Sequence, residues 1–350
     1  MQGISRDCKF LQRAAGVLKQ EQFTLIDVGC SGGFDPGWRL FGDKLQAVGF
    51  DPNVEECERL TSKEALRSVR YVPAFVGLRP DHPFARLKAS KPDVENNPWG
   101  RLSVTRTIGI RQKEIENLPL AGKIEFNDWK QTRLADANHP VFLPEFFEEH
   151  HIHNIDFIKM DVDGRDFEIL HSLENVFADA RVIGFGMEVN FIGSASETDH
   201  TFHNTDRFMR RHGFDLFQLS VRPYSAAALP SRYQLAVPAQ TEFGRPLQGD
   251  ALYVRDLCHS ANADLAAALS VEKVLKTAAI FAVFGLPDCA AEILLKFRAG
   301  LAALCDVDSL LDTLAAQAQE PRGSHLSYRQ YVAAFEQDSA LFYPRRVAAP

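Results

Sequence analysis

A glycine-rich bend between two acidic strand ends constrains this chain more than any other feature. Residues 23–28 form an apolar stretch rich in β-formers that carries Asp27 near its end, and residues 29–33 contain three glycines. A second short apolar stretch ends at Asp51, directly before Pro52. A strand, a flexible turn and a carboxylate about 20 residues further on are typical of a nucleotide-cofactor site on a parallel sheet.

The chemistry of the bend narrows the choice of cofactor. A dinucleotide fingerprint needs glycine at three fixed places, where this chain has Gly29, Ser31 and Phe34. Asp27 would repel a pyrophosphate, but it would attract the ammonium of S-adenosylmethionine, which has no phosphate. We therefore predict S-adenosylmethionine as the cofactor, with Asp27 near its cationic part and Asp51 near its ribose. The predicted cofactor-binding residues are Asp27, Gly29, Cys30, Ser31, Gly33, Asp51 and Pro52.

Both acids also have structural explanations. Asp27 could cap a helix after the bend, and Asp51 could be a turn residue before Pro52.

Composition indicates a cytoplasmic enzyme. The 350 residues are 45% hydrophobic, which suffices for a real core, and the net charge of −7 comes from mixed signs along the chain. This pattern excludes a nucleic-acid-binding surface. The six cysteines contain no C-x-x-C pair, so neither a disulfide framework nor a zinc site is expected. The longest apolar run, near residues 278–284, is far short of the roughly 20 residues of a membrane span.

Alternating strand-like and helix-like segments predict an α/β fold over residues 1–256, with a doubly wound, mostly parallel sheet. Expected strands include 23–28, 47–50, 71–76, 155–160 and 182–189, with a closing pair at 214–220 and 251–254. A helix is expected over residues 53–68. Residues about 77–135 are polar and irregular, and we interpret them as a long insertion.

Residues 257–350 have a different character. Alanine, leucine, lysine and glutamate recur there at helical spacing, and Gly285-Leu-Pro-Asp288 is typical of a turn between two helices. These residues predict an all-helical appendage and tail. A packing cap, or a dimer surface for a homo-oligomer, explains it better than a substrate-recruiting module.

Further acids follow two of the later strands. Asp161 and Asp163 come directly after residues 155–160, and Glu188 lies near the end of 182–189. Ligands of open α/β sheets bind outside the carboxyl ends of the strands, so these three acids are our candidate catalytic residues. Structural alternatives are helix capping for Asp161 or Asp163, before a helix from about Arg165, and an ion pair for Glu188.

Three blocks together resemble the FkbM family of methyltransferases. They are residues 27–33, 49–53 and 155–164, and the likeness covers about residues 22–255 in order and spacing. The third block is the most specific, because the family typically reads K-I-D-V-E-G where this chain has Lys159-Met-Asp-Val-Asp-Gly164. Asp51 and Asp163 stand where the family usually has glutamate, Arg133-Leu-Ala-Asp136 matches only partly, and the helical appendage is not part of the pattern.

The resemblance implies a seven-stranded class I, Rossmann-like methyltransferase fold. It also implies S-adenosylmethionine-dependent methylation of a hydroxyl on a sugar, glycan or secondary metabolite, so the partner is a small-molecule or carbohydrate acceptor. A hydroxyl acceptor must lose its proton, which requires a base: one of the three acids, or a histidine of residues 197–206.

Two other functions stay open. One is a Mg²⁺-dependent O-methyltransferase with Asp161 and Asp163 as ligands. The other is a catalytically silent methyltransferase fold that serves as a binding subunit. The tract His150-His151-Ile152-His153 fits solvated surface histidines better than a metal site, so we expect no metal there.

Overall fold

The computed structural model describes residues 4–91, 132–162, 164–179, 182–224, 243–320 and 325–338. Asp163 and residues 92–131 of the expected insertion lie outside these ranges. The chain divides into two compact units. The first, the sheet unit, contains Thr24–Phe34 and Gln46–Asp256; the second, the helical unit, contains Gly3–Phe23, Asp35–Leu45 and Leu257–Pro350. The domain boundary expected near residue 256 stays a prediction, and the helical unit also takes in two N-terminal segments.

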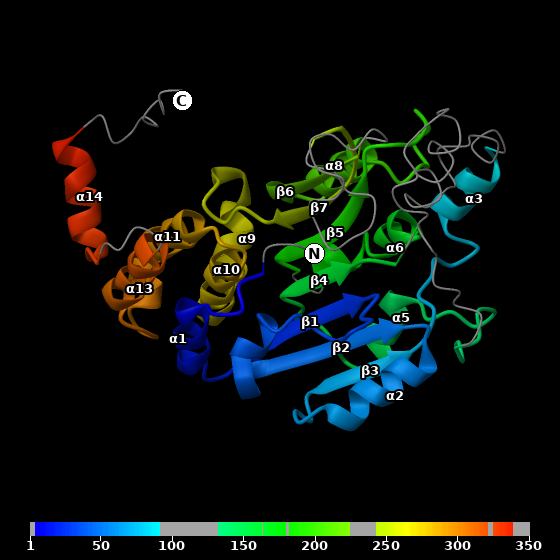
Figure 1. Cartoon of the computed structure of the whole chain (residues 1–350), viewed down its shortest axis with the longest axis horizontal. Coiled ribbons are helices and arrows are strands. Elements are labelled where there is room, and N and C mark those ends of the chain that lie inside the picture. Colours follow the sequence, from blue (N-terminus) through cyan, green and yellow to red (C-terminus); the bar gives the residue numbers. More distant parts are fainter. Residues whose placement is uncertain are drawn as a thin grey trace. The chain divides into compact units, whose positions relative to one another are not determined.

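The sheet has seven strands in the order β3-β2-β1-β4-β5-β7-β6 (Figure 1). The pairs β2–β3, β1–β4 and β4–β5 are parallel, whereas β7 runs antiparallel to both β5 and β6. This topology confirms the predicted class I fold, including its closing strand pair. The strands are β1 (Phe23–Val28), β2 (Leu45–Asp51), β3 (Val69–Pro73), β4 (Phe157–Met160), β5 (Gly184–Asn190), β6 (Asp215–Tyr224) and β7 (Arg245–Val254).

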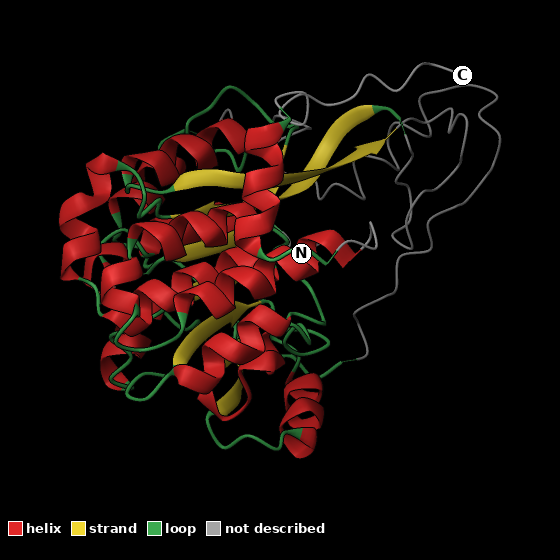
Figure 2. Ribbon diagram, turned by 90° about the vertical axis from the view of Figure 1, so that its left-hand side faces the viewer, coloured by secondary structure: helices red, strands yellow, loops and turns green. Residues whose placement is uncertain are grey.

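Helices follow these strands in the alternation that the sequence predicts. Figure 2 shows the helices in red and the strands in yellow. The helices that follow the strands are α2 (Val54–Lys63), α3 (Pro83–Ala89), α5 (Leu143–Glu149), α6 (Asp166–Ser172), α7 (Val176–Asp179) and α8 (Phe202–Arg211). The Asn53 side chain caps α2 by accepting from the Glu56 amide. This helix ends at Lys63, five residues before the predicted end at Ser68. Strand β4 begins at Phe157, and the Asp156 side chain before it accepts from the Thr24 amide at 2.8 Å.

Strand alternation places the candidate site residues on one face of the sheet, where they follow buried apolar positions such as Leu25 and Phe157. Ile26, Ile158 and Phe185 belong to the buried core, together with Phe167 and Leu170 of α6. Successive side chains of a strand point to opposite faces. The neighbouring positions Asp27 and Lys159, which are register partners, therefore lie on the other face. Glu188 of β5 lies there too, because it alternates with the core residues Met187 and Val189.

The helical unit contains α1 (Lys9–Val17), the 3-10 helix η1 (Trp38–Lys44) and the segments after residue 256. These are η4 (Ser260–Asn262), α9 (Ala263–Ala268), α10 (Val271–Val283), α11 (Pro287–Lys296), α12 (Arg298–Leu301), α13 (Val307–Gln319) and α14 (Tyr328–Gln337). Gly285, with φ +74°, separates α10 from α11, which confirms the predicted turn. Most of α10 is buried, including Lys273 and Lys276.

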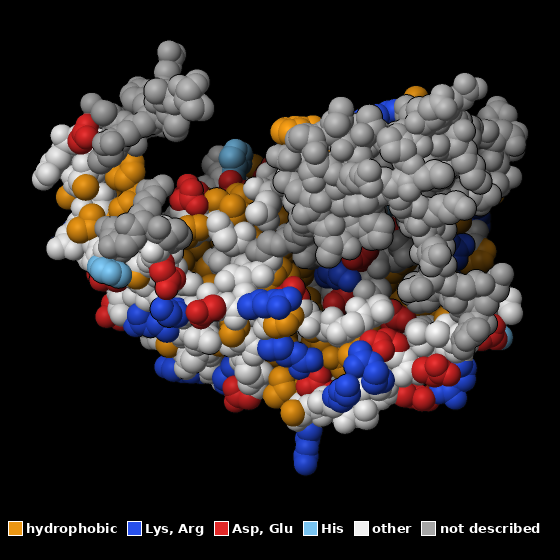
Figure 3. All heavy atoms as spheres, viewed as in Figure 1, with side chains coloured by type: hydrophobic (Ala, Val, Ile, Leu, Met, Phe, Trp, Pro, Cys, Tyr) orange, Lys and Arg blue, Asp and Glu red, His pale blue; other side chains and the backbone are white. Residues whose placement is uncertain are grey.

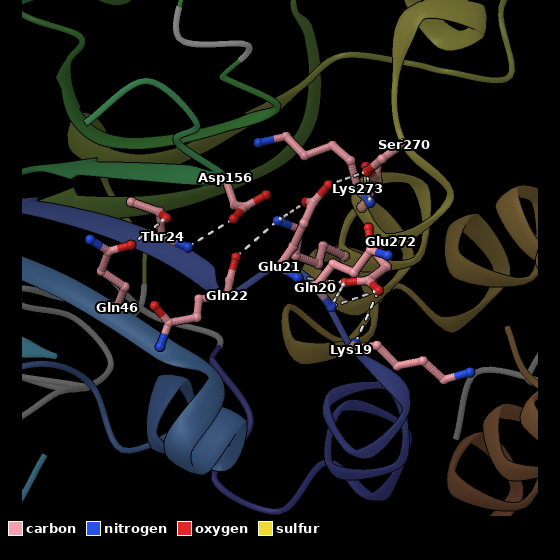
Figure 4. A network of polar contacts seen from close by, with 12 residues as sticks. Lys19, Gln20, Glu21, Gln22, Thr24, Gln46, Asp156, Ser270, Glu272 and Lys273 are labelled. Atoms are coloured by element: carbon pink, nitrogen blue, oxygen red, sulfur yellow. Dashed lines mark hydrogen bonds and ion pairs between the residues drawn. The ribbon is translucent and has the colours of Figure 1, made fainter. Parts of the chain in front are cut away.

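A polar network holds the segment that leads into β1 (Figure 4). The Glu272 carboxylate accepts from the backbone amides of Lys19, Gln20 and Glu21 at 2.8–3.2 Å. Lys276 Nζ lies 2.7 Å from the Glu21 carboxylate and donates to the Gln22 carbonyl at 3.0 Å. We call this set the Glu272 clamp. Both of its carboxylates are occupied, Glu272 by backbone amides and Glu21 by the Lys276 ammonium, so it is a structural element.

Among the described residues, no helix has the length and apolar character needed to cross a membrane. The six cysteines lie within the described residues, and none of them forms a disulfide there. Acidic and basic side chains are interspersed over the face that Figure 3 shows.

Candidate functional site

The glycine bend lies where the carboxyl ends of β1, β2 and β4 meet. The amides of Gly29 and Cys30 both donate to the Phe50 carbonyl of β2, at 2.8 and 3.0 Å. Gly29 has φ +86°, and a Cβ atom there would lie only 1.8 Å from the Asp161 carbonyl oxygen. Only glycine permits this close approach, so the residue joins the bend to the end of β4.

The remaining residues of the bend divide between buried and exposed positions. Cys30 is buried, and its thiol lies so close to Gly49 that a Cβ atom there would be 2.7 Å from Sγ. Ser31 and Gly32 are exposed, and the Gly32 amide donates to the Glu56 carboxylate at 3.0 Å. Gly33 has φ +89° and packs against Leu60. The exposed part of the bend therefore consists of backbone and the small side chain of Ser31, with no large side chain.

Asp51 ends β2 beside this bend. Its carboxylate accepts from the Asn53 amide at 2.8 Å and from the Ser31 amide. Burial raises the pKa of Asp51, and these hydrogen bonds partly offset that effect. The Pro52 carbonyl accepts from the Ala135 amide at 2.8 Å, so the partly matching segment that begins at Arg133 is anchored next to Asp51.

A buried lysine connects Asp27 with Asp161. Lys159 Nζ lies 3.1 Å from Asp27 Oδ1 and 3.6 Å from Asp161 Oδ2, and it donates to the Gly29 carbonyl at 2.7 Å. Burial raises the pKa of Asp27 to about 6, although Lys159 opposes this. Burial acts to lower the pKa of Lys159, but the two carboxylates outweigh it and raise that pKa. We call Asp27, Lys159 and Asp161 the Lys159 triad.

The triad is more exposed at one end. The Asp27 side chain is 7% exposed and that of Lys159 16%, but that of Asp161 is 36% exposed. If all three groups are ionised, the triad carries one net negative charge. It can therefore attract a cation at its Asp161 end.

Glu188 is a second buried carboxylate at this edge of the sheet. Its Oε2 accepts from Arg222 Nη2 at 2.7 Å, and Arg222 also pairs with Asp250 at 3.3 Å. Burial raises the pKa of Glu188 to about 8, and the negative charge of Asp161 adds to this rise. The structure thus confirms that Glu188 is a member of an ion pair. The raised pKa also fits a proton acceptor.

The loop after β4 is organised by Asp166, not by Asp161. Asp166 is 1% exposed, and its carboxylate accepts from the amides of Val162 and Gly164 at 2.9 and 3.2 Å. Helix capping by Asp161, the structural alternative, is not observed, because α6 begins after Arg165 without a side-chain cap and Asp161 pairs with Lys159. Asp163 lies outside the described residues.

Residues 197–206 supply a histidine to the same edge. His200 Nε2 lies 3.1 Å from the Glu188 carbonyl oxygen, and Nδ1 lies 3.4 Å from Asn190 Nδ2. Burial lowers the pKa of His200, which favours the neutral ring. The expected helix starts at Phe202 instead of Thr205.

The structure therefore brings Asp27, Asp51, Asp161 and Glu188 to the carboxyl ends of four neighbouring strands. Sequence reasoning gave no role to Lys159, Asp166 or Arg222. Lys159 stood in the most specific block and had the strand spacing to face Asp161, so it could have been found. Arg222 had no comparable signal, because its partners come from two other strands.

Metal-ligating groups do not cluster in the described ranges. Among those residues, no set of three or more His, Cys, Asp or Glu side chains could hold a metal ion. His150, His151 and His153 are exposed, as expected of surface histidines.

Residues 95–216 match the model of the Methyltransferase FkbM domain, which confirms the resemblance to that family. Of the three blocks, the match contains the third, residues 155–164. No curated protein sequence matched the chain.

Solved structures also matched the chain, those described here at 10% identity or less. A SAM-dependent methyltransferase from Aquifex aeolicus is 10% identical, with 71% of this chain and 91% of that chain covered and a TM-score of 0.30. A TehB-like SAM-dependent methyltransferase from Corynebacterium glutamicum is also 10% identical, with 71% and 89% covered and a TM-score of 0.28. Magnesium protoporphyrin IX methyltransferase from Synechocystis, with bound SAM, is 6% identical, with 70% and 76% covered and a TM-score of 0.28.

Proposed function

We propose that this chain, which carries a match to the FkbM methyltransferase domain over residues 95–216, uses S-adenosylmethionine to methylate a hydroxyl group. The acceptor is a sugar, a glycan or a secondary metabolite. The observation that carries this proposal is the contact of Gly29 with the Asp161 carbonyl, because it places a bend without bulk between the acids of three strand ends.

Asp51 and the exposed face of the bend support binding of the cofactor's nucleoside. In an open α/β sheet such a ligand lies outside the carboxyl ends of the strands. Asp51 is already oriented there by the amides of Ser31 and Asn53. A carboxylate fixed in this way can accept hydrogen bonds from both hydroxyl groups of a ribose. We assign the ribose to Asp51 and Pro52, and the remaining cofactor contacts to Gly29–Gly33.

The Lys159 triad supports a revised role for Asp27. The Lys159 ammonium already occupies the space beside the Asp27 carboxylate, so Asp27 holds Lys159. The cofactor's cation then lies nearer to Asp161, the more exposed end of the triad. Asp27 contributes through the net negative charge that the triad keeps.

Glu188 is the base that the geometry favours. Methyl transfer needs donor and acceptor held in line, and a hydroxyl must also lose its proton. A carboxyl with a pKa of about 8 is a stronger base than an ordinary one and is partly ionised at neutral pH. His200 is less suited, because its Nε2 is engaged with the Glu188 carbonyl.

Two glycine substitutions test the site as a matched pair. Gly29→Ala would force a Cβ atom onto the Asp161 carbonyl, whereas Gly32 has a similar φ of +82° and no atom within 4 Å of its Cβ position. We expect Gly29→Ala to weaken S-adenosylmethionine binding by at least about 100-fold, and Gly32→Ala by less than about tenfold. Isothermal titration calorimetry measures both. Equal affinities of the two variants for S-adenosylmethionine would show that the bend is not part of the cofactor site.

The magnesium-dependent alternative makes a different prediction. Asp161 is engaged with Lys159, and the cation would compete with Lys159 for its carboxylate. We therefore expect the transfer rate to change by less than about twofold in excess EDTA. Loss of activity in EDTA that Mg²⁺ restores would establish the alternative instead. Cofactor binding without transfer to any hydroxyl acceptor would favour the silent binding subunit.

A further inference from the structure

One side chain at the end of β5 has an unused hydrogen-bonding atom. Asn190 is the last residue of β5, two positions after Glu188. Its Oδ1 is buried, and it has no hydrogen-bond partner among the described residues. Buried polar atoms are normally paired, and leaving one unpaired costs about 1–3 kcal/mol. An unpaired acceptor beside the proposed base therefore needs an explanation.

The neighbouring histidine fixes the orientation of this amide. The Glu188 carbonyl oxygen can only accept, so His200 Nε2, 3.1 Å away, must carry the proton. In the neutral ring Nδ1 is then an acceptor, and the Asn190 Nδ2 group, 3.4 Å away, donates to it. Turning the amide around would place Oδ1 against this acceptor atom. Oδ1 is thus left facing away from His200.

The position of His200 is itself fixed. Its ring lies parallel to that of Phe167, with ring centroids 6.3 Å apart. Asp166 Oδ2 lies 3.8 Å from Nδ1, and Asp166 is held by the loop amides of Val162 and Gly164. Asn190 is therefore oriented before any ligand binds, which reduces the entropy cost of recognition.

We propose that Asn190 is a specificity-determining residue for the methyl acceptor, and that its Oδ1 accepts a hydrogen bond from a second hydroxyl near the one that is methylated. An amide oxygen does not take up the proton, so Asn190 orients the acceptor while Glu188 acts as base. The acceptor is therefore a polyol such as a sugar ring, not an isolated alcohol or phenol. This inference rests on the methyltransferase function proposed above.

Asn204 offers a matched control. It is a buried asparagine whose amide is fully paired, whereas Asn190 is half-buried. Asn204 Nδ2 donates to the carbonyls of Ser196 and Asp199 at 2.8 and 2.9 Å, and Asn204 Oδ1 accepts from Arg207 at 3.2 Å. Asn204→Leu leaves two carbonyls without donors, and we expect it to lower Tm by about 5 °C. Asn190→Leu removes an unpaired acceptor and one long hydrogen bond, so its Tm should stay within about 2 °C of the unsubstituted protein.

The functional test uses monosaccharides and their deoxy analogues as acceptors, with release of the demethylated cofactor as the readout. In Asn190→Leu we expect KM for a reactive sugar to rise about tenfold, with KM for S-adenosylmethionine unchanged. A deoxy analogue that lacks the second hydroxyl should react equally with both proteins.

Three results would overturn the inference: a loss of Tm in Asn190→Leu that matches Asn204→Leu, an unchanged KM for sugars, or an unsubstituted enzyme that methylates no sugar. Failure of the parent proposal is recognised separately, because the unsubstituted protein would then show no calorimetric binding of S-adenosylmethionine.

Discussion

The Lys159 triad and the Glu272 clamp contain the same kinds of groups but differ in how fully their carboxylates are hydrogen-bonded. Each contains a buried lysine that pairs with a carboxylate and donates to a backbone carbonyl, that of Gly29 in the triad and that of Gln22 in the clamp. In the clamp, the carboxylate of Glu272 is occupied by three backbone amides. In the triad, the Asp161 side chain stays 36% exposed.

This difference separates a structural network from a binding site. A buried charge is tolerated when hydrogen bonds and counter-charges satisfy it, and the clamp meets that condition without a ligand. The triad keeps a net negative charge and an accessible carboxylate. Substitutions in the clamp should therefore change stability, whereas substitutions in the triad should change chemistry.

The largest effect is expected in the clamp. Glu272→Leu leaves the amides of residues 19–21 without their acceptor, at about 1 kcal/mol or more for each amide, so the free energy of unfolding should fall by about 3 kcal/mol. Urea denaturation measures this loss. Glu292→Leu, on the exposed side of α11, is the control and should change stability by less than about 0.5 kcal/mol. A clamp variant as stable as its control would show that water replaces Glu272 at no cost.

In the triad, a substitution should change the rate of methyl transfer more than the stability. Lys159→Met removes the cation between Asp27 and Asp161, and we expect the transfer rate to fall about 100-fold, or about 2.7 kcal/mol in the barrier. Stability should fall less than in Glu272→Leu, because Asp27, whose pKa is already about 6, can take up a proton once Lys159 is gone.

Steady-state kinetics and urea denaturation together measure this contrast. Lys91→Met is the control, since Lys91 forms an exposed ion pair with Glu197. A Lys159→Met protein with an unchanged rate and a large loss of stability would make the triad a structural network like the clamp.

The comparison also explains which features the sequence could predict. The bend, its flanking acids and the β-α alternation are local patterns, and local patterns determine a strand, a turn and the edge where acids gather. The role of Lys159 depends on the register that pairs it with Asp27, 132 residues away, and register is a property of the assembled sheet. The same holds for Arg222, which joins Glu188 and Asp250 across β5 and β7.

Asp166 was missed for a different reason. Two acids stood before it at positions that suit helix capping, and a single sequence does not show which acid of such a run turns inward. The structure shows that the inward one holds the amides of Val162 and Gly164. Asp161 is thereby left free to pair with Lys159.

The smallest effect concerns the pH dependence of stability. It tests whether Glu188 takes up a proton in the folded protein or is as fully paired as the Glu272 carboxylate of the clamp. Burial raises the pKa of Glu188 to about 8, above its usual value of 4.5. Between these two values the folded state binds more protons at this site than the unfolded state. Its contribution to stability is therefore fully present below about pH 4.5 and is lost as the pH rises toward 8. Glutamine does not titrate, so Glu188→Gln lacks this pH-dependent loss. The difference in the free energy of unfolding, variant minus unsubstituted protein, should therefore rise by at least about 1.4 kcal/mol from pH 5 to pH 8, the equivalent of one pKa unit.

Urea denaturation across this pH range measures the difference, and Glu149→Gln at the exposed end of α5 is the control. The rate of methyl transfer should show the complementary behaviour, because only the ionised carboxylate accepts a proton: it should rise with pH and level off above about 8 in the unsubstituted enzyme. A stability difference that does not change with pH would mean that Arg222 keeps Glu188 ionised throughout. Glu188 would then resemble Glu272, a carboxylate whose partners satisfy it completely, and the base would have to be sought elsewhere at this edge of the sheet.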